Sequence, residues 1–143
     1  MRLVLAADHG GFELKNQLAV ALAAQGHAVT DIGTDSATSV DYTDYAHRAA
    51  IAILAGTYDL GILVCGTGVG MAISANRHAG IRAVNCSDTF TARMSREHND
   101  ANVLAIGARV VGPGLAKDIV EAWLAAKFEG GRHVKRVEKI ELP

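Results

Sequence analysis

The sequence predicts an α/β fold: a three-layer α/β/α, Rossmann-like (doubly wound) domain around a five-stranded, mostly parallel sheet. Short apolar runs alternate along the chain with segments in which apolar residues recur every three or four positions, the patterns of buried strands and of amphipathic helices. Such alternation favours a parallel sheet with helices on both faces. The 143 residues contain no linker and no repeat, so residues 1–143 are expected to form a single domain.

Five apolar runs are expected to be strands. The first, residues 2–8, reads as a strand that is buried on both faces, and the third leads directly into Cys65. The remaining three strands are expected at 27–32, 81–86 and 103–106.

The segments between these strands have helical periodicity. A helix is expected from Phe12 to Gly26, a second one before Gly56, a third from Met71, and a fourth that Ser87 or Asp88 caps and that reaches about residue 98. The last long helix is expected to stop near 129–131, and its predicted buried face comprises Leu115, Ile119, Ala122, Trp123 and Ala126. The tail, residues 130–143, is expected to form one or two helical turns that contribute to phosphate binding or to a dimer interface.

Composition excludes several classes of function. With 14 basic and 15 acidic residues, the chain has neither the charge expected of a nucleic-acid-binding protein nor a polybasic patch for a membrane surface. No segment approaches the length of a membrane span, and the N-terminal apolar run is too short for a signal peptide. Cys65 and Cys86 match no zinc spacing and no disulfide framework. We therefore expect a cytoplasmic protein.

The most informative stretch is the glycine loop that follows the third strand. Cys65 precedes glycines at every second position, Gly66, Gly68 and Gly70, and a helical pattern begins at Met71. A strand, a glycine loop and a helix in this order direct several backbone N–H groups at one place, which suits negative charge. Only the thiolate form of a cysteine is a base or a nucleophile, and nearby N–H groups favour that form.

Four interpretations of this loop remain open from the residues alone. A dinucleotide fingerprint would need a small residue where Met71 stands, although Asp88 lies roughly where a ribose-binding acid would. A tyrosine-phosphatase loop would need arginine at that same position. The other two are an oxyanion-binding loop with Cys65 as a proton-transfer group, and a tight turn beside an inert cysteine.

Other candidate residues lie at the ends of predicted elements. Asp8 and His9 end the first strand and are expected to lie near Cys65, because ligands in such sheets bind at the carboxyl ends of strands. His98 stands at a helix end, where the residues alone favour a structural role, because a positive charge there suits the helix dipole. Arg132 and Arg136 are four residues apart and would share a helix face, an arrangement that suits either a phosphate or a solvated basic tail.

Separate blocks over nearly the whole chain occur in the order of one known family. They are Asp8-His9-Gly10-Gly11-Phe12, Asp41-Tyr42, Cys65-Gly66-Thr67-Gly68-Val69-Gly70, Gly80-Ile81-Arg82-Ala83, Ser95-Arg96-x-His98-Asn99-Asp100, Gly107-x-Arg109-Val110 and Glu129-Gly130-Gly131-Arg132-His133. On these blocks the chain resembles the type B ribose-5-phosphate isomerase family, which also holds allose-6-phosphate and galactose-6-phosphate isomerase subunits. Some relatives use a glutamate slightly further along the loop, but residues 71–75 contain no acid here, so the cysteine variant matches better.

The resemblance implies a role for each candidate residue. Cys65 would move a proton between C1 and C2 of the open-chain sugar with help from Thr67, and His98 would open the furanose ring. The substrate-binding residues would be Asp8, His9, Tyr42, Gly66, Gly68, Gly70, Asn99, Arg109, Arg132 and Arg136, of which His9, Arg109, Arg132 and Arg136 would hold the phosphate.

The resemblance also implies the partners of the chain. The substrate would be a sugar phosphate, D-ribose 5-phosphate in equilibrium with D-ribulose 5-phosphate in the pentose phosphate pathway, and no metal or organic cofactor would be needed. The protein would be a homodimer, or a tetramer of the same units, with the active site between subunits. A hexose 6-phosphate such as allose 6-phosphate is the alternative substrate, and a non-catalytic phosphate- or nucleotide-binding domain of flavodoxin-like build is the less favoured alternative.

Overall fold

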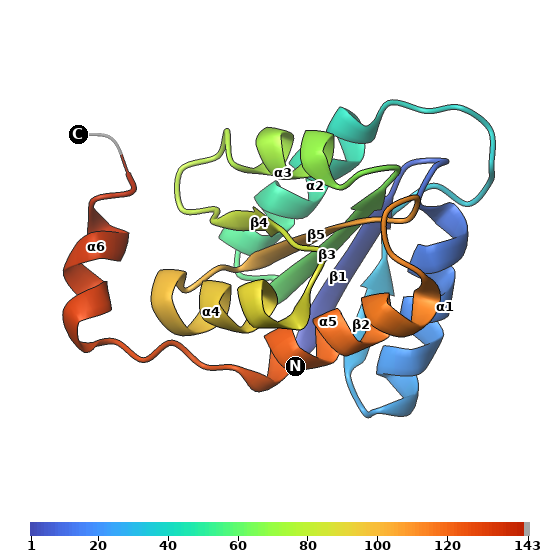
Figure 1. Cartoon of the computed structure of the whole chain (residues 1–143). Coiled ribbons are helices and arrows are strands. Elements are labelled where there is room, and N and C mark those ends of the chain that lie inside the picture. The colour runs from blue at the N-terminus through green and yellow to red at the C-terminus, as the bar shows by residue number, and fades with distance from the viewer. Residues whose placement is uncertain (142–143) are drawn as a thin grey trace.

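A parallel sheet of five strands forms the middle layer of the computed structural model, which describes residues 1–141 (Figure 1). The strands are β1 (Arg2–Ala7), β2 (Ala28–Asp31), β3 (Leu60–Cys65), β4 (Ala83–Asn85) and β5 (Val103–Gly107). They lie in the order β2-β1-β3-β5-β4, and every neighbouring pair is parallel. The predicted fold class is confirmed, with all five strands parallel.

The central strands are buried on both faces, which explains their continuous apolar sequences. Side chains along β1 alternate between two cores: Leu3 and Leu5 face one, and Val4 and Ala6 face the other. The sheet is therefore sandwiched between two helical layers.

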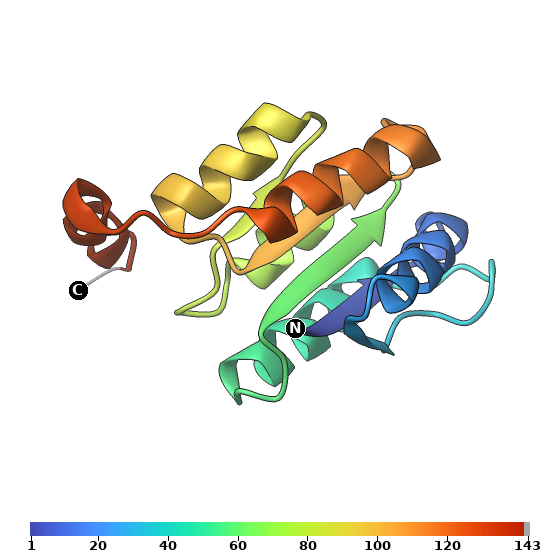
Figure 2. The ribbon, with the colours of Figure 1, turned by 90° about the horizontal axis from the view of Figure 1, so that it is seen from below.

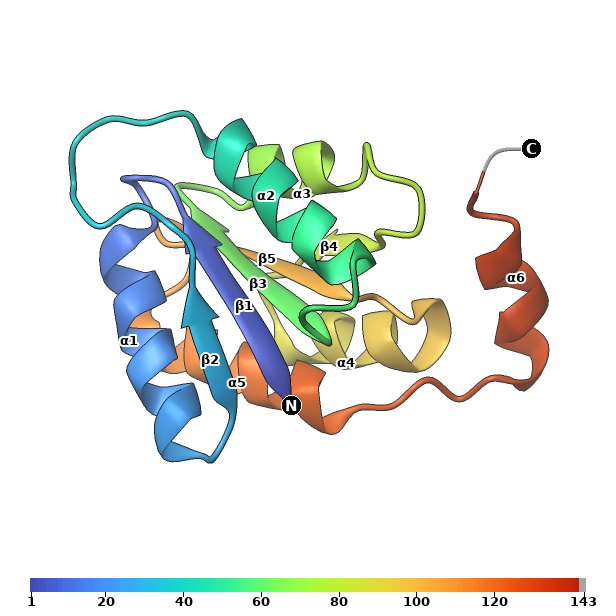
Figure 3. The same cartoon turned by 180° about the vertical axis from the view of Figure 1, so that it is seen from behind.

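The first layer contains α1 (Phe12–Ala24), α4 (Thr89–Asn99) and α5 (Pro113–Ala125), whose apolar faces share one core. Figure 2 shows α5 lying between α4 and α1. The second layer contains α2 (Tyr42–Leu54) and α3 (Val69–Ala75), which bury mainly alanine and methionine against the opposite face. The small alanine side chains let both helices lie close to the sheet (Figure 3).

Three predicted boundaries and one predicted face need correction. The helix α5 ends at Ala125 rather than near 129–131, because Ala126 is already extended and the chain leaves the sheet there. Leu115, predicted to be buried, is 43% exposed, and Ala116 faces the core in its place. The fourth strand is only three residues long, and the second is shorter by one residue at each end than predicted.

The tail crosses away from the sheet before it turns helical. It forms the short 3-10 helix η1 (Gly131–His133) and α6 (Val134–Glu138), which stands apart from the other helices in Figures 1 and 3. The predicted helical turns are thus confirmed, although residues 142–143 of the predicted 130–143 tail lie outside the described residues. Within residues 1–141, no helix is long and apolar enough to cross a membrane.

Candidate active site

The loops that follow β1 and β3 lie directly against each other at the carboxyl edge of the sheet. The two strands are neighbours, so the loop beginning at Asp8 meets the loop beginning at Cys65. Glycine is needed at this contact, because a Cβ on Gly11 would lie 2.3 Å from the carbonyl oxygen of Val64. The structure therefore brings Asp8 and Cys65 to the same edge, as the predicted topology required.

Cys65 is held under the glycine loop. Its side chain is buried, with 5% of the residue exposed, and its Sγ accepts the backbone N–H of Gly68 at 3.0 Å. The thiolate is the form of cysteine that acts as a base. Thr67, two residues on, is exposed, and its Oγ1 accepts the N–H of Val69 at 3.3 Å.

The shape of this loop depends on Gly68 and Asn85. Gly68 has a φ of +82°, and a Cβ there would lie 2.0 Å from the Nδ2 of Asn85. The amide of Asn85 donates to the carbonyl oxygens of Thr67 at 3.1 Å and Ala105 at 3.2 Å. The sequence reasoning missed Asn85; its only signal was a polar residue near the carboxyl end of a predicted strand.

Tyr42 and Arg109 lie over the two ends of the same loop. A Cβ on Gly70 would lie 2.7 Å from the ring of Tyr42, and one on Gly66 would lie 3.3 Å from Nη1 of Arg109. The backbone N–H of Arg109 also donates to the carbonyl oxygen of Gly66 at 3.0 Å. A phenol and a guanidinium thus lie close beside the cysteine loop, and the contact of Tyr42 with Gly70 leaves no room for a Cβ.

His9 joins this site to the long loop before α2. Its Nδ1 accepts the backbone N–H of Val40 at 3.1 Å, so in the neutral ring the proton is on Nε2, which is then a donor. A cavity of about 220 Å³ adjoins His9 and is also lined by Phe12, Gln17 and Ala37.

The remaining predicted site residues lie at the opposite ends of the strands, where the strands begin. His98 and Asn99 end α4, which runs back from the carboxyl end of β4 to the start of β5. The five residues of β5 separate this point from the carboxyl edge, where Gly107 pairs with Cys65; at about 3.3 Å per residue this is roughly 15 Å. A single copy of the chain therefore holds these predicted residues as two separate groups.

Arg132 and Arg136 belong to the second group. Both are exposed, and the single helix face predicted for them is divided between η1 and α6. Burial lowers the pKa of His133, which lies between them in the sequence, and the positive charges of both arginines act in the same direction.

Comparison with known proteins decides the family. A profile described as ribose/galactose isomerase matches residues 3–140. The chain belongs to this family. It is a sugar-phosphate isomerase.

Two curated relatives and one solved structure illustrate this likeness. Ribose-5-phosphate isomerase B of Escherichia coli (strain K12) is 53% identical over 139 residues, which cover 97% of this chain and 93% of that protein. D-erythrulose-4-phosphate isomerase of Pectobacterium atrosepticum is 46% identical over 141 residues, with 98% of this chain and 95% of that protein covered. The structure of ribose-5-phosphate isomerase B from Clostridium thermocellum has a TM-score of 0.97 at 52% identity and covers 98% of this chain and 95% of that one.

In this isomerase, His98 is stacked on His133. The two imidazole rings are nearly parallel, with centroids 4.3 Å apart and planes at 10°. The Oε2 of Glu129 lies 3.9 Å from Nε2 of His98 and 3.5 Å from Nε2 of His133. Burial lowers the pKa of His133 below its usual 6.5, the charges of His98, Arg132 and Arg136 act in the same direction, and Glu129 opposes them.

Within residues 1–141, the side chains of His98, Glu129 and His133 are the set whose donor atoms are close enough to hold a metal ion, all lying within 4.8 Å of one another. Metal ligation requires lone pairs that converge on one point, whereas the lone pairs of two stacked, parallel rings run side by side. The charges of Arg132 and Arg136 also oppose a cation here. The geometry therefore does not favour a metal.

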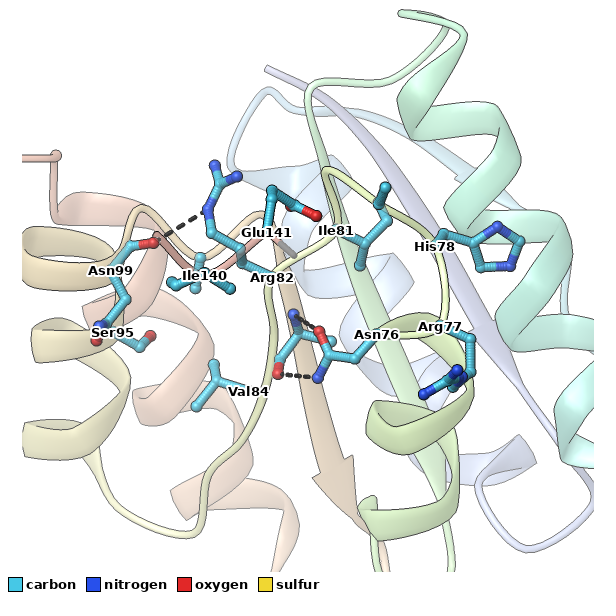
Figure 4. Close-up of a pocket in the computed structure, with 13 residues that line it drawn as sticks. Asn76, Arg77, His78, Ile81, Arg82, Val84, Ser95, Asn99, Ile140 and Glu141 are labelled. Carbon is cyan, nitrogen blue, oxygen red and sulfur yellow. Dashed lines mark hydrogen bonds between the residues drawn. The ribbon is translucent and has the colours of Figure 1, made fainter. Parts of the chain in front are cut away.

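A larger cavity of about 560 Å³ lies between the loop after α3, the end of α4 and the tail (Figure 4). Asn99 is the one predicted site residue that lines it, and its carbonyl oxygen accepts the Nε–H of Arg82 at 3.1 Å. Glu141 closes one side of this cavity by accepting the backbone N–H of Gly80 at 2.7 Å. The cavity thus adjoins the second group of predicted residues, away from Cys65.

Proposed function

We propose that this sugar-phosphate isomerase interconverts D-ribose 5-phosphate and D-ribulose 5-phosphate through an enediolate, with Cys65 as the base. The thiolate takes the proton from C2 of the open-chain aldose and returns it to C1, while the hydroxyl proton moves from O2 to O1. The relatives named ribose-5-phosphate isomerase B support the choice of sugar.

One observation carries this proposal: the buried sulfur of Cys65 lies under the Gly68 N–H in a loop flanked by Asp8, Tyr42 and Arg109. Aldose–ketose isomerisation needs a base beside a weakly acidic C–H and donors near the oxygens on which charge develops. The cysteine supplies the first requirement. The backbone of residues 66–70 and the hydroxyl of Thr67 are the donors that we assign to the second.

We further propose that each active site is completed by a second copy of the chain, in a homodimer or in a tetramer built from such dimers. The two groups of predicted residues lie at opposite ends of the strands of one sheet. A two-fold arrangement can therefore bring the first group of one copy against the second group of its neighbour. In that arrangement His98 and Asn99 of one copy reach the sugar that is bound beside Cys65 of the other copy. Arg132 and Arg136 then hold the phosphate together with His9 and Arg109 of the other copy.

A hexose 6-phosphate is the second candidate substrate. The loop of residues 33–41 is tied to His9 through Val40 and borders the cavity of about 220 Å³, so its position determines how much sugar fits. Since a relative of 46% identity is named for a four-carbon sugar, the length of the sugar varies among related chains.

The proposal is tested by measuring kcat/KM on ribose 5-phosphate, allose 6-phosphate and erythrose 4-phosphate in the presence of a metal chelator. We expect the highest kcat/KM on ribose 5-phosphate. A higher value on either other sugar would overturn the choice of substrate, and turnover of none of them would overturn the proposed function.

A further inference from the structure

The side of His98 that faces the protein is built from two groups of the tail, His133 and Glu129. His133 presents the flat face of its ring to His98, and the Glu129 carboxylate faces the ring nitrogens of both histidines. The backbone N–H of Glu129 donates to the carbonyl oxygen of Glu97 at 3.0 Å, which fixes the start of the tail beside the last turn of α4. His98 is therefore held by residues distant from it in sequence.

His133 is an unusual residue to bury at this position. Only 5% of it is exposed, and its buried Nε2 has no hydrogen-bond partner among residues 1–141. A buried polar atom without a partner costs about 1–3 kcal/mol, so its presence calls for a compensating role. Burial and the surrounding positive charges keep this ring neutral, which allows it to lie against the ring of His98 without repulsion.

We propose that His133 and Glu129 are positioning residues for His98 in the ring-opening step. This inference rests on the proposed function, because it assigns a task to the two groups that adjoin the ring-opening acid. His133 fixes the plane of the His98 ring, and Glu129 fixes the direction of its Nε2.

Ring opening makes a strict demand on the orientation of the acid. The C1–O4 bond of the furanose breaks, O4 takes a proton from His98, and the proton of the C1 hydroxyl leaves to solvent, from which His98 is recharged. Misplacing an acid by about 1 Å can reduce the rate on the order of 100-fold. The distances of 3.5 Å and 3.9 Å to Glu129 exceed those of hydrogen bonds, as is usual for catalytic contacts in free enzymes that tighten on binding substrate.

Hydrogen exchange at C1 of ribulose 5-phosphate separates this role from a general effect on the site. Ribose 5-phosphate is mainly a closed furanose in water, whereas ribulose 5-phosphate is acyclic because the hydroxyl that would close its ring is esterified. The ratio of kcat/KM in the two directions equals the equilibrium constant, so a slower ring step reduces isomerisation equally in both directions. Exchange of a C1 hydrogen of ribulose 5-phosphate with D2O passes through the enediolate and back and involves no ring. Damage to phosphate binding through Arg132 or Arg136 would therefore reduce both isomerisation and exchange, whereas damage to His98 would reduce isomerisation only.

The experiment measures isomerisation of ribose 5-phosphate, and exchange of the C1 hydrogen of ribulose 5-phosphate with D2O, for Glu129→Gln, His133→Leu and His133→Phe, with Glu138→Gln as a control that removes a nearby exposed acid of the tail. The kcat/KM of isomerisation should fall on the order of tenfold or more in Glu129→Gln and His133→Leu. The rate of C1 exchange should stay close to wild type. His133→Phe should recover most of the loss because it keeps a flat ring, and Glu138→Gln should resemble wild type.

Equal losses of isomerisation and of C1 exchange, or no loss of either, would overturn the inference while leaving the proposed function intact. Phenylalanine failing to recover what leucine loses would overturn the stacking role of His133. If His133→Leu does not fold, Glu129→Gln decides the question alone, since Glu129 is exposed and glutamine is nearly the same size. Absence of wild-type activity on both sugars would overturn the proposed function and this inference with it.

Discussion

Cys65 and Cys86 are both buried, but the groups around their sulfur atoms differ. The sulfur of Cys65 accepts the backbone N–H of Gly68. Cys86 lies in the apolar core, where burial, helped by the charge of Asp88, raises its pKa to about 11. Cys86 therefore stays a neutral thiol near pH 7, and it serves as an internal control for the chemistry assigned to Cys65.

Gly68→Ala should distort the cysteine loop. The positive φ and the contact with Asn85 make any side chain unfavourable there, and such strain costs about 1–3 kcal/mol of the free energy of unfolding. Thermal unfolding should show that loss together with reduced kcat. Gly114→Ala is the matched control, because a Cβ there meets nothing within 4 Å and alanine should change the stability by about 1 kcal/mol at most. Equal stability of the two variants would contradict this account of the loop.

Arg136→Ala should raise KM for ribose 5-phosphate well beyond its effect on folding. A hydrogen bond to a charged group is worth about 1.5–3 kcal/mol, which corresponds to a rise on the order of 10- to 100-fold. Lys139→Ala removes a positive charge from the same tail and should leave KM near the wild-type value. An unchanged KM in Arg136→Ala would remove this residue from the phosphate site.

The helix ends show which local sequence signals were sufficient to predict where an element begins or ends. Gly26 has a φ of +87° beyond α1, and Asp88 caps α4 by accepting the N–H of Thr91 at 2.7 Å, as expected from local sequence alone. The fourth strand is present but begins later than predicted, because a side-chain amide takes the place of the backbone partner at Arg82. Asn76 exchanges two hydrogen bonds with the backbone of Ala83, and Asn102 accepts the N–H of Arg82, partners that no local pattern indicates.

The attachment of the tail element should depend on pH. In the unfolded chain His133 takes up a proton near its usual pKa of 6.5, but its pKa is lower in the folded chain, so between the two values the unfolded state binds more protons. Stability is therefore complete above about pH 6.5 and falls as the pH decreases toward the folded pKa. The Tm of the wild type, measured from about pH 7.5 to about pH 5, should fall more steeply than that of His133→Phe. Parallel curves would contradict the buried, neutral state of His133.

For the whole molecule, the sequence predicted the sheet and the residues at its carboxyl edge but not the separation of the site into two groups. That separation arises because all the strands are parallel, so that α4 ends beside the start of β5 while the loops after β1 and β3 lie at the other ends of the strands. The stacking of His98 on His133 was also missed, because it depends on the path of the tail after α5. The roles of the site residues remain predictions.

Co-expression of Cys65→Ala with His98→Asn should restore activity if the site is shared between copies. In a hybrid dimer, one of the two sites receives an intact Cys65 from one copy and an intact His98 from the other. Random pairing should then give about one quarter of wild-type activity, because half of the dimers are hybrids with one working site each. Activity no greater than that of the separate variants would place each site within a single chain.

The central claim, that Cys65 moves the proton, is tested most directly by kcat for ribose 5-phosphate in Cys65→Ala beside Cys86→Ala. Loss of the base should reduce kcat by at least about 100-fold with the circular dichroism spectrum unchanged, whereas Cys86→Ala should remain near wild type. Retention of kcat in Cys65→Ala, or an equal loss in both variants, would contradict the account.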